Sequence, residues 1–192
     1  MGADDSGRLT WNIDASFAVH LDCKSHTGAC LTLGHGSILS ISAKQKINMK
    51  SSTKAELVGV DDAMTFVMWM KHFFESQVRS VNMDSPLKPL GSDVTIEQDN
   101  TSAIQLESNG WKSSNKRTKH INVRYFYMTD RLKAGDISRI IIKPTGDMES
   151  DYLTKELQGK SFHTHCKTLM GLEGINKHMF YEKYKNDKIP SQ

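Results

Sequence analysis

The hydrophobic pattern of the first quarter of the chain predicts an antiparallel sheet. Apolar and polar residues alternate from Leu9 to His20, which is the pattern of a strand with one buried face. Two more strand-like runs cover residues 27–33 and 37–43, and Gly34-His-Gly36 between them is typical of a tight turn. The chain therefore opens with a predicted three-stranded meander, and we expect the polar residues 1–8 before it to be disordered.

Helical and strand patterns alternate after this meander. The expected helices cover residues 51–74, 101–107, 120–133 and 147–157, the expected strands cover residues 94–98 and 137–142, and residues 76–92 are expected to be a loop. This order predicts an α/β fold in which parallel strands join the antiparallel meander in a mixed five-stranded sheet flanked by helices. We expect one domain over residues 9–158, followed by a helical or flexible extension over residues 159–192.

Composition limits the classes of function. The chain has 192 residues, of which 38% are hydrophobic, and this is typical of a soluble domain with a real core. The net charge of +3 is too small to argue for nucleic-acid binding, which must rest on local patches. Three cysteines without a CxxC motif favour a reducing compartment. We therefore expect an intracellular protein, cytoplasmic or alternatively nuclear, with no membrane partner.

Four carboxylates stand far apart in the sequence: Asp14, Glu56, Asp99 and Asp151. Asp14 lies within the first strand, where a buried charge is costly unless it is paired or binds a metal. Asp99 follows a strand, and ligands gather beyond the carboxyl ends of strands in α/β sheets. Ordinary explanations also exist, because Glu56 fits a capping box with Thr53, Asp99 fits a helix cap, and the other two fit solvated surfaces.

The combination of the four carboxylates changes this interpretation. Acids on a strand, at a helix start, at a strand end and on a late helix can converge at one edge of a five-stranded sheet. Carboxylates held close together repel one another unless cations neutralise them, and oxygen ligands select hard cations such as Mg²⁺ or Mn²⁺. Two such ions can hold the attacking water and the leaving oxygen of a phosphoryl displacement. The sequence therefore predicts a two-metal site for cutting a phosphodiester.

Six short segments carry a resemblance to a known family. They are Asp14-Ala-Ser-Phe-Ala-Val-His20, Lys24-Ser-His-Thr-Gly28, Ser51-Ser-Thr-Lys-Ala-Glu56, Asp99-Asn-Thr-Ser-Ala-Ile104, Arg117-Thr-Lys-His-Ile121 and Ser150-Asp-Tyr-Leu-Thr-Lys155. In this order and spacing the chain resembles the ribonuclease H domain of Ty1/copia-type retrotransposon polyproteins, which follows the reverse transcriptase. The match runs from about Leu9 to Phe162.

The resemblance implies a fold, a reaction and a set of site residues. The fold would be that of ribonuclease H, and Asp14, Glu56, Asp99 and Asp151 would form the catalytic set that binds two Mg²⁺ or Mn²⁺ ions. The reaction would be hydrolysis of the RNA strand of an RNA–DNA hybrid, with discrimination through the 2′-hydroxyl groups in the wide minor groove. The reverse transcriptase domain of the same polyprotein would be the protein partner.

A basic loop over residues 109–119 offers contacts to the substrate. Its cations and the start of the next helix can hold backbone phosphates. With two polar residues beside the acids, the expected substrate-binding set is Ser52, Asn100, Lys112, Lys116, Arg117, Lys119 and His120.

Some positions depart from the family pattern. Lys54 stands where the family usually has an acid, Ser150 where it often has alanine, and Glu156 where it usually has proline. Residues 143–147 contain no histidine, although many ribonucleases H carry one on the loop before the last acid. Two alternatives therefore stay open: a weak or inactive module that binds hybrids or docks the polymerase, and a related nuclease such as an integrase or resolvase.

Overall fold

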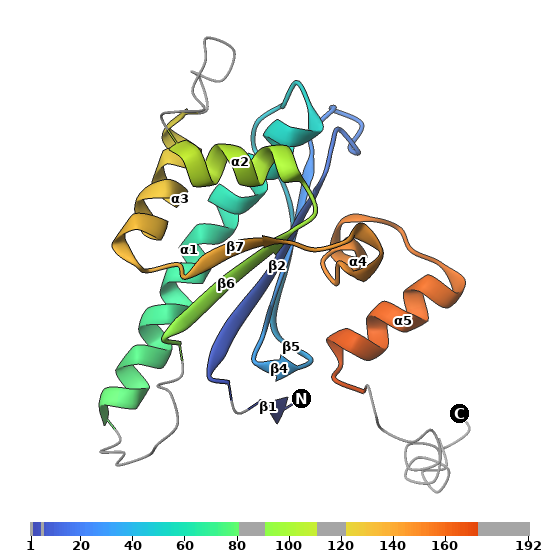
Figure 1. Cartoon of the computed structure of the whole chain (residues 1–192). Helices are drawn as coiled ribbons and strands as arrows, with labels where there is room; N and C mark the ends of the chain where they lie inside the picture. Colours follow the sequence, from blue (N-terminus) through green and yellow to red (C-terminus); the bar gives the residue numbers. More distant parts are fainter. Residues whose placement is uncertain (1, 5, 81–90, 111–121, 173–192) are drawn as a thin grey trace, which may run out of the picture.

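A mixed sheet forms the centre of the molecule. The computed structural model describes residues 2–4, 6–80, 91–110 and 122–172 (Figure 1). The sheet has five strands in the order β5-β3-β2-β6-β7. Their bounds are β2 Arg8–Ser16, β3 His26–Thr32, β5 Ser37–Lys44, β6 Asp93–Gln98 and β7 Arg139–Ile142. The β2–β3 and β3–β5 pairs are antiparallel, whereas β2–β6 and β6–β7 are parallel, which confirms the predicted fold class.

Helices flank this sheet on both sides. One group comprises α1 Ser52–Ser80, α2 Thr101–Asn109 and α3 Asn122–Ala134, and the other comprises α4 Asp151–Thr154 and α5 Gly159–Leu169. Figure 1 shows the first group on one side of the sheet, with α4 and α5 on the other. Helix α1 contacts β2 and β3, and α4 contacts the same strands. Strand β2, in the middle of the sheet, is therefore covered on both faces.

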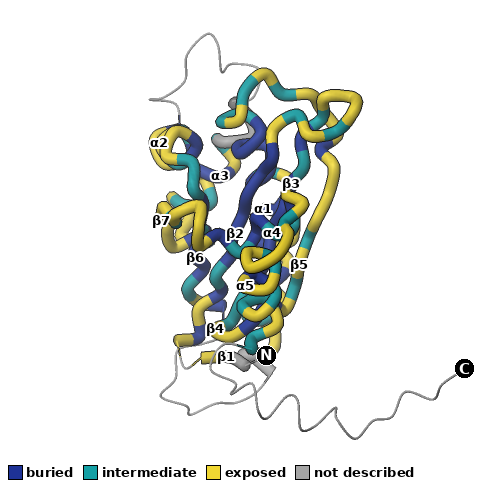
Figure 2. Tube along the Cα trace, turned by 90° about the vertical axis from the view of Figure 1, so that its right-hand side faces the viewer, coloured by how far each residue is buried: buried dark blue, intermediate teal, exposed yellow. Residues whose placement is uncertain are grey.

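The alternating residues of β2 explain how this sandwich is packed. Leu9, Trp11 and Ile13 are fully buried in a cluster that also contains Val60 and Met64 of α1. The residues between them point to the opposite face, yet they are also largely buried, as the dark blue trace of β2 in Figure 2 shows. Asp14 therefore lies on a covered face of a central strand.

The N-terminal segment differs from the prediction that residues 1–8 are disordered. Gly2–Ala3 form β1, which pairs with β4 (Gly34–His35) in a small separate sheet. Arg8 already belongs to β2, where it pairs with Asp93 in register and its Nε lies 3.1 Å from Asp93 Oδ2. The β1–β4 and β2–β6 pairings thus give a regular structure to residues 2–3 and to Arg8, although these residues show no hydrophobic pattern in the sequence.

Two helices also differ in length from the predictions. Helix α1 continues to Ser80, beyond the start of the expected loop. The expected helix 147–157 is only a short 3-10 turn, Thr145–Asp147, followed by the single turn of α4. Lys155 ends α4 because its backbone is extended, with φ −129° and ψ 145°. In the extension, α5 provides a helix, while residues 173–192 lie outside the described residues.

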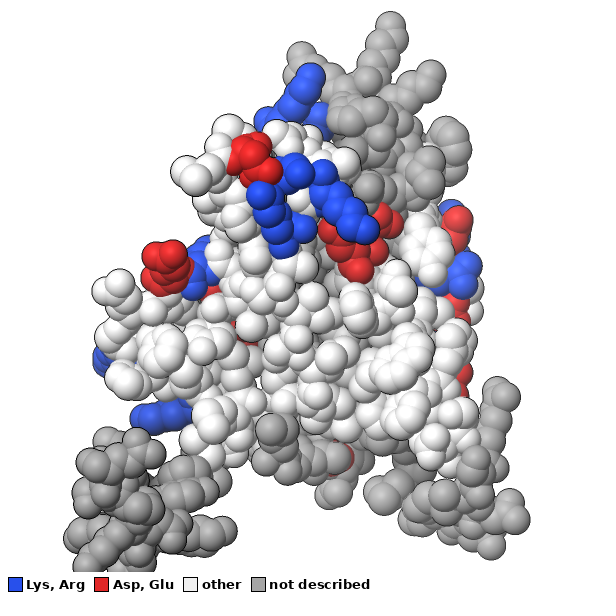
Figure 3. Space-filling model, turned by 180° about the vertical axis from the view of Figure 1, so that it is seen from behind, with Lys and Arg blue, Asp and Glu red and all other residues white. Residues whose placement is uncertain are grey.

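None of the described helices is suited to cross a membrane, and the face of the molecule seen from behind is not uniformly basic. No helix among residues 2–80, 91–110 and 122–172 is both long enough and apolar enough to cross a bilayer. Figure 3 shows basic and acidic side chains lying next to one another, above a broad area with few charges.

Candidate metal centre

Asp14 is held between the central strand and the short helix α4. The residue is only 2% exposed, and in the β2–β3 ladder it stands opposite Gly28. A Cβ atom at Gly28 would lie 2.6 Å from Thr154 Cγ2, so the glycine is what allows α4 to approach the strand. In this position Thr154 Oγ1 donates a hydrogen bond to Asp14 Oδ2.

Glu56 reaches the same place from the first turns of α1. The capping box with Thr53, which was the ordinary explanation for Glu56, is wrong, because Ser51 caps the helix: its Oγ accepts the Lys54 N–H at 3.4 Å. Glu56 is instead a buried residue, 5% exposed, and its carboxylate accepts a hydrogen bond from the Ala15 backbone N–H. Its Oε2 has no hydrogen-bond partner within the described part of the chain.

Asp99 enters from the carboxyl end of β6. The cap of the following helix is Asn100, whose Oδ1 accepts the Ala103 N–H at 3.1 Å. Asp99 is therefore not needed as a cap, and its Oδ2 accepts a hydrogen bond from Thr145 Oγ1 at 2.8 Å. The strand-end position thus leaves the carboxylate directed toward the other acids.

These three acids form one group. One carboxylate oxygen from each of Asp14, Glu56 and Asp99 lies within 4.8 Å of the others. Burial, together with repulsion from the other two acids, raises the pKa of Glu56 to about 9. Burial also raises the pKa of Asp14, although the Thr154 hydrogen bond and Lys155 oppose it. Three carboxylates with an unpartnered buried oxygen fit a hard divalent cation, because such an ion supplies the missing charge and coordination.

Asp151 lies beside this group rather than within it. It begins α4 and is 7% exposed. Lys155 Nζ lies 2.6 Å from Asp151 Oδ1 and 4.0 Å from Asp14 Oδ2. Burial opposes the charge on Lys155, but the hydrogen bond with Asp151 and the nearby acids raise its pKa. The structure therefore brings three of the four predicted acids together and connects the fourth through a lysine.

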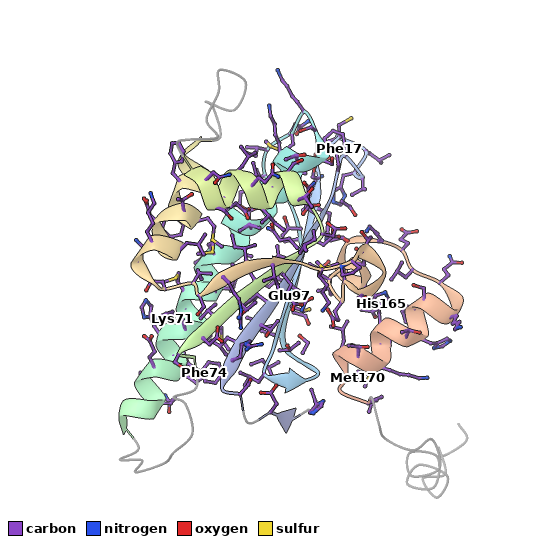
Figure 4. All side chains as sticks on the ribbon, in the orientation of Figure 1. Phe17, Lys71, Phe74, Glu97, His165 and Met170 are labelled. Carbon is purple, nitrogen blue, oxygen red and sulfur yellow. The ribbon has the colours of Figure 1, made fainter. Side chains whose placement is uncertain are left out.

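An open hollow of about 690 Å³ lies above the acids. Two of the predicted substrate-binding residues, Ser52 and Asn100, line it. Phe17, which was not predicted, also lines it, and Figure 4 shows this residue at the upper end of the sheet. The remaining predicted substrate contacts lie outside the described residues: Lys112, Lys116, Arg117, Lys119 and His120.

A network of contacts around Lys143, close to the segment that leads into α4, was not predicted. Lys143 Nζ lies 2.8 Å from Glu97 Oε2, 2.5 Å from Glu149 Oε2 and 2.9 Å from Asn12 Oδ1. Figure 4 shows Glu97 in the middle of the sheet, so Lys143 ties the segment before α4 to the strands. The i,i+4 spacing of Asp151 and Lys155 was a usable signal in the sequence, whereas the contacts of Lys143 with Asn12 and Glu97 join residues that are 131 and 46 positions apart.

Comparisons with known proteins give a consistent relationship. No family model matches the chain. The chain is 30% identical over 163 residues, 83% of its length, to the retrovirus-related Pol polyprotein from transposon TNT 1-94 of Nicotiana tabacum. It is 31% identical over 145 residues, 73% of its length, to the corresponding polyprotein from transposon RE1 of Arabidopsis thaliana. It spans only 11% and 9% of the lengths of these two relatives.

A solved structure shares the fold. The ribonuclease H1 named LC11, isolated from compost by a metagenomic approach, superimposes with a TM-score of 0.50 at 11% sequence identity. The superposition covers 77% of this chain and 92% of that one. At this identity the likeness concerns the fold.

Proposed function

Because this chain belongs to the ribonuclease H domains of retrovirus-related Pol polyproteins from transposons, we propose that it hydrolyses the RNA strand of RNA–DNA hybrids with divalent metal ions. The six sequence segments favour the Ty1/copia type. The reaction would serve reverse transcription inside the cell, with the reverse transcriptase domain of the same polyprotein as partner.

The observation that carries this proposal is the group of three acids. Asp14, Glu56 and Asp99 come from three separate elements, and their oxygens lie within 4.8 Å of one another. Buried carboxylates held this close repel one another and raise one another's pKa, so the group lowers the stability of the fold unless protons or cations neutralise it. Groups of this kind are typical of functional sites. Mg²⁺ or Mn²⁺ bound there would supply a nucleophile at neutral pH and neutralise the charge that develops on the scissile phosphate.

The four acids have different parts in this proposal. Asp14, Glu56 and Asp99, whose oxygens lie within 4.8 Å of one another, would hold a divalent ion. Asp151 would be the fourth acid of the proposed two-ion site. Thr154 holds the Asp14 carboxylate in place by donating a hydrogen bond to its Oδ2, so this ligand is oriented by a partner on α4.

Polar groups on the rim can contact the substrate. Asn100 uses its Oδ1 to cap α2, so its amide nitrogen is the group left to donate to a nucleotide. Ser52 lines the same hollow at the start of α1. A 2′-hydroxyl both donates and accepts hydrogen bonds, and these two side chains suit its recognition. The basic residues 112–119 and His120 complete the proposed contacts to backbone phosphates.

Cleavage of labelled nucleic acids tests the proposal. The full chain is mixed with a fluorescently labelled RNA–DNA hybrid and Mg²⁺ or Mn²⁺, and we expect RNA fragments with 3′-hydroxyl and 5′-phosphate ends. Asp99→Asn should reduce the rate by about a thousandfold or more, because it removes an electrostatic contribution to the transition state. Asp130→Asn is the matched control, since Asp130 is exposed on α3, and it should cleave like the wild type.

The substrate series separates the other possible functions. Duplex DNA and branched DNA should remain intact, and preferential cutting of either would favour a different nuclease. If folded wild-type protein binds the hybrid but cleaves it with neither metal, the domain acts by binding, and the proposed hydrolysis is wrong.

A further inference from the structure

A lysine reaches into the proposed metal centre from the end of α4. Lys155 lines the hollow with Asp14, Glu56 and Asp99, and it is the cationic residue among the described residues that line it. Its Nζ lies 2.6 Å from Asp151 Oδ1 and 4.0 Å from Asp14 Oδ2. The ammonium group is therefore located between two of the four acids.

The local structure fixes this placement. Lys155 follows Asp151 by four residues, so the pair faces the same side of the single turn of α4. That turn is anchored because Thr154 donates to Asp14 and because Gly28 leaves room for the helix against β3. The lysine thus comes to the acids with the same element that supplies Asp151.

The Lys155 ammonium group and a divalent ion placed between Asp14 and Asp151 would need the same carboxylate oxygens. A divalent ion of the Mg²⁺ type takes ligand oxygens at about 2.0–2.1 Å and near-ideal geometry. Asp151 Oδ1 is already hydrogen-bonded to Lys155, and Asp14 Oδ2 lies 4.0 Å from the same ammonium nitrogen. An ion between Asp14 and Asp151 would have to displace the ammonium group, whereas an ion among Asp14, Glu56 and Asp99 would leave its bond to Asp151 intact.

We propose that Lys155 is a built-in cation that occupies the position of the second divalent ion and competes with it for Asp14 and Asp151. The chain would then bind one ion readily at the group of three acids and a second ion only by displacing the lysine. This inference rests on the proposed function, because the same acids are taken as metal ligands. It predicts that the charge of Lys155 sets the concentration of metal that the site needs.

Metal titration of the full chain tests the competition without relying on cleavage. Isothermal titration calorimetry with MnCl₂, together with the electron paramagnetic resonance signal of free Mn²⁺, gives the number and affinity of bound ions. We expect Lys155→Met to tighten the second, weaker site by about five- to tenfold, which is the size of a typical coupling between two binding events. The first site should change less.

Two further variants make the measurement specific. Lys160→Met removes the same charge from an exposed residue of α5, and it should bind Mn²⁺ like the wild type. Lys155→Gln keeps a hydrogen-bonding side chain but removes the charge, so it provides the test if Lys155→Met does not fold by circular dichroism. It should show the same tightening.

The outcomes distinguish this inference from the proposed function. If the wild type and the Lys155 variants bind Mn²⁺ equally, or if the variants bind it more weakly, the competition is wrong while the metal centre stands. If the wild type and the Lys155 variants bind no Mn²⁺, or if Asp14→Asn leaves their Mn²⁺ binding unchanged, both the metal centre and this inference are overturned.

Discussion

A single methyl group added to β3 should displace the helix that carries the fourth acid. Gly28 stands opposite Asp14, and a Cβ atom there would lie 2.6 Å from Thr154 Cγ2, 2.8 Å from Ser150 O and 2.9 Å from Leu153 Cβ. All three atoms belong to α4 or the residue that precedes it, and one of them is backbone. Gly28→Ala therefore cannot be accommodated by turning one flexible side chain, and α4 must move away from the sheet.

The size of the effect follows from these contacts. Restoring an ordinary separation of 3.4 Å requires a shift of 3.4 − 2.6 = 0.8 Å at Thr154 and 3.4 − 2.9 = 0.5 Å at Leu153. Overpacking of this kind costs about 1–3 kcal/mol, and the loss of backbone freedom in the unfolded chain returns about 0.4–1 kcal/mol. We expect a net loss of about 1–2 kcal/mol in the free energy of unfolding. Catalysis should fall further, by about a hundredfold, because a misplacement near 1 Å disturbs the ligand geometry.

The assay combines urea unfolding, followed by tryptophan fluorescence, with the rate of hybrid cleavage. Gly146→Ala is the matched control, because a Cβ there meets nothing within 4 Å and its φ is not positive. This control should be as stable as the wild type, or slightly more stable, and fully active. If Gly28→Ala unfolds at the same urea concentration and cleaves at the same rate as the control, the close approach of α4 to β3 does not position the site.

Two other predictions concern buried charges away from the group of three acids. Burial raises the pKa of Glu107, on α2, to about 8, above its ordinary value near 4.5, so its stabilising contribution is full below pH 4.5 and is lost as the pH rises through about 8. In thermal unfolding, Glu107→Gln should therefore match the wild type near pH 4.5 and exceed it at pH 8–9 by something on the order of 5 kcal/mol, since the pKa moves from 4.5 to about 8 and each pH unit corresponds to about 1.4 kcal/mol. A difference that is constant from pH 5 to 9 would contradict this. Lys143→Met should lower the free energy of unfolding by about 2 kcal/mol, between the values for exposed and buried ion pairs, because it leaves Glu97 and Glu149 without their cation. Lys44→Met, which removes an exposed partner of Asp22, should cost less than about 1 kcal/mol in the same urea titration, and equal costs would refute the distinction.

The sequence predicted the elements that carry the acids better than the contacts between them. Asp14 could be placed in a strand because the alternation around it is a local property, and the strand order explains why it is buried. Asp99 could be placed because a strand end is visible in the sequence. The cap of α1 could not be assigned correctly, since Ser51, Ser52 and Thr53 all suit a cap and only the three-dimensional backbone selects Ser51.

The region around α4 shows what local patterns leave out. A helix of one turn has no hydrophobic period from which its bounds can be read, and the sequence therefore suggested a longer helix. Its position depends on Gly28, which is remote in sequence and has an unremarkable backbone conformation in β3. The β1–β4 pair is similar, because its strands contain two residues each. Contacts of this kind depend on the tertiary structure, so Asp151 was the acid whose place could be predicted least.

The arrangement around Asp14 suggests how the chain tolerates its own acids before any ion binds. A buried carboxylate is costly unless hydrogen bonds or an opposite charge compensate it. Thr154 supplies a hydrogen bond to Asp14 and Lys155 supplies a nearby charge, and both come from the end of α4. Glu56 has no cation within the described contacts, and its raised pKa means that a proton provides the compensation near neutral pH. The same chain therefore uses a lysine on one side of Asp14 and a proton on the other, and each would have to be displaced as metal ions enter.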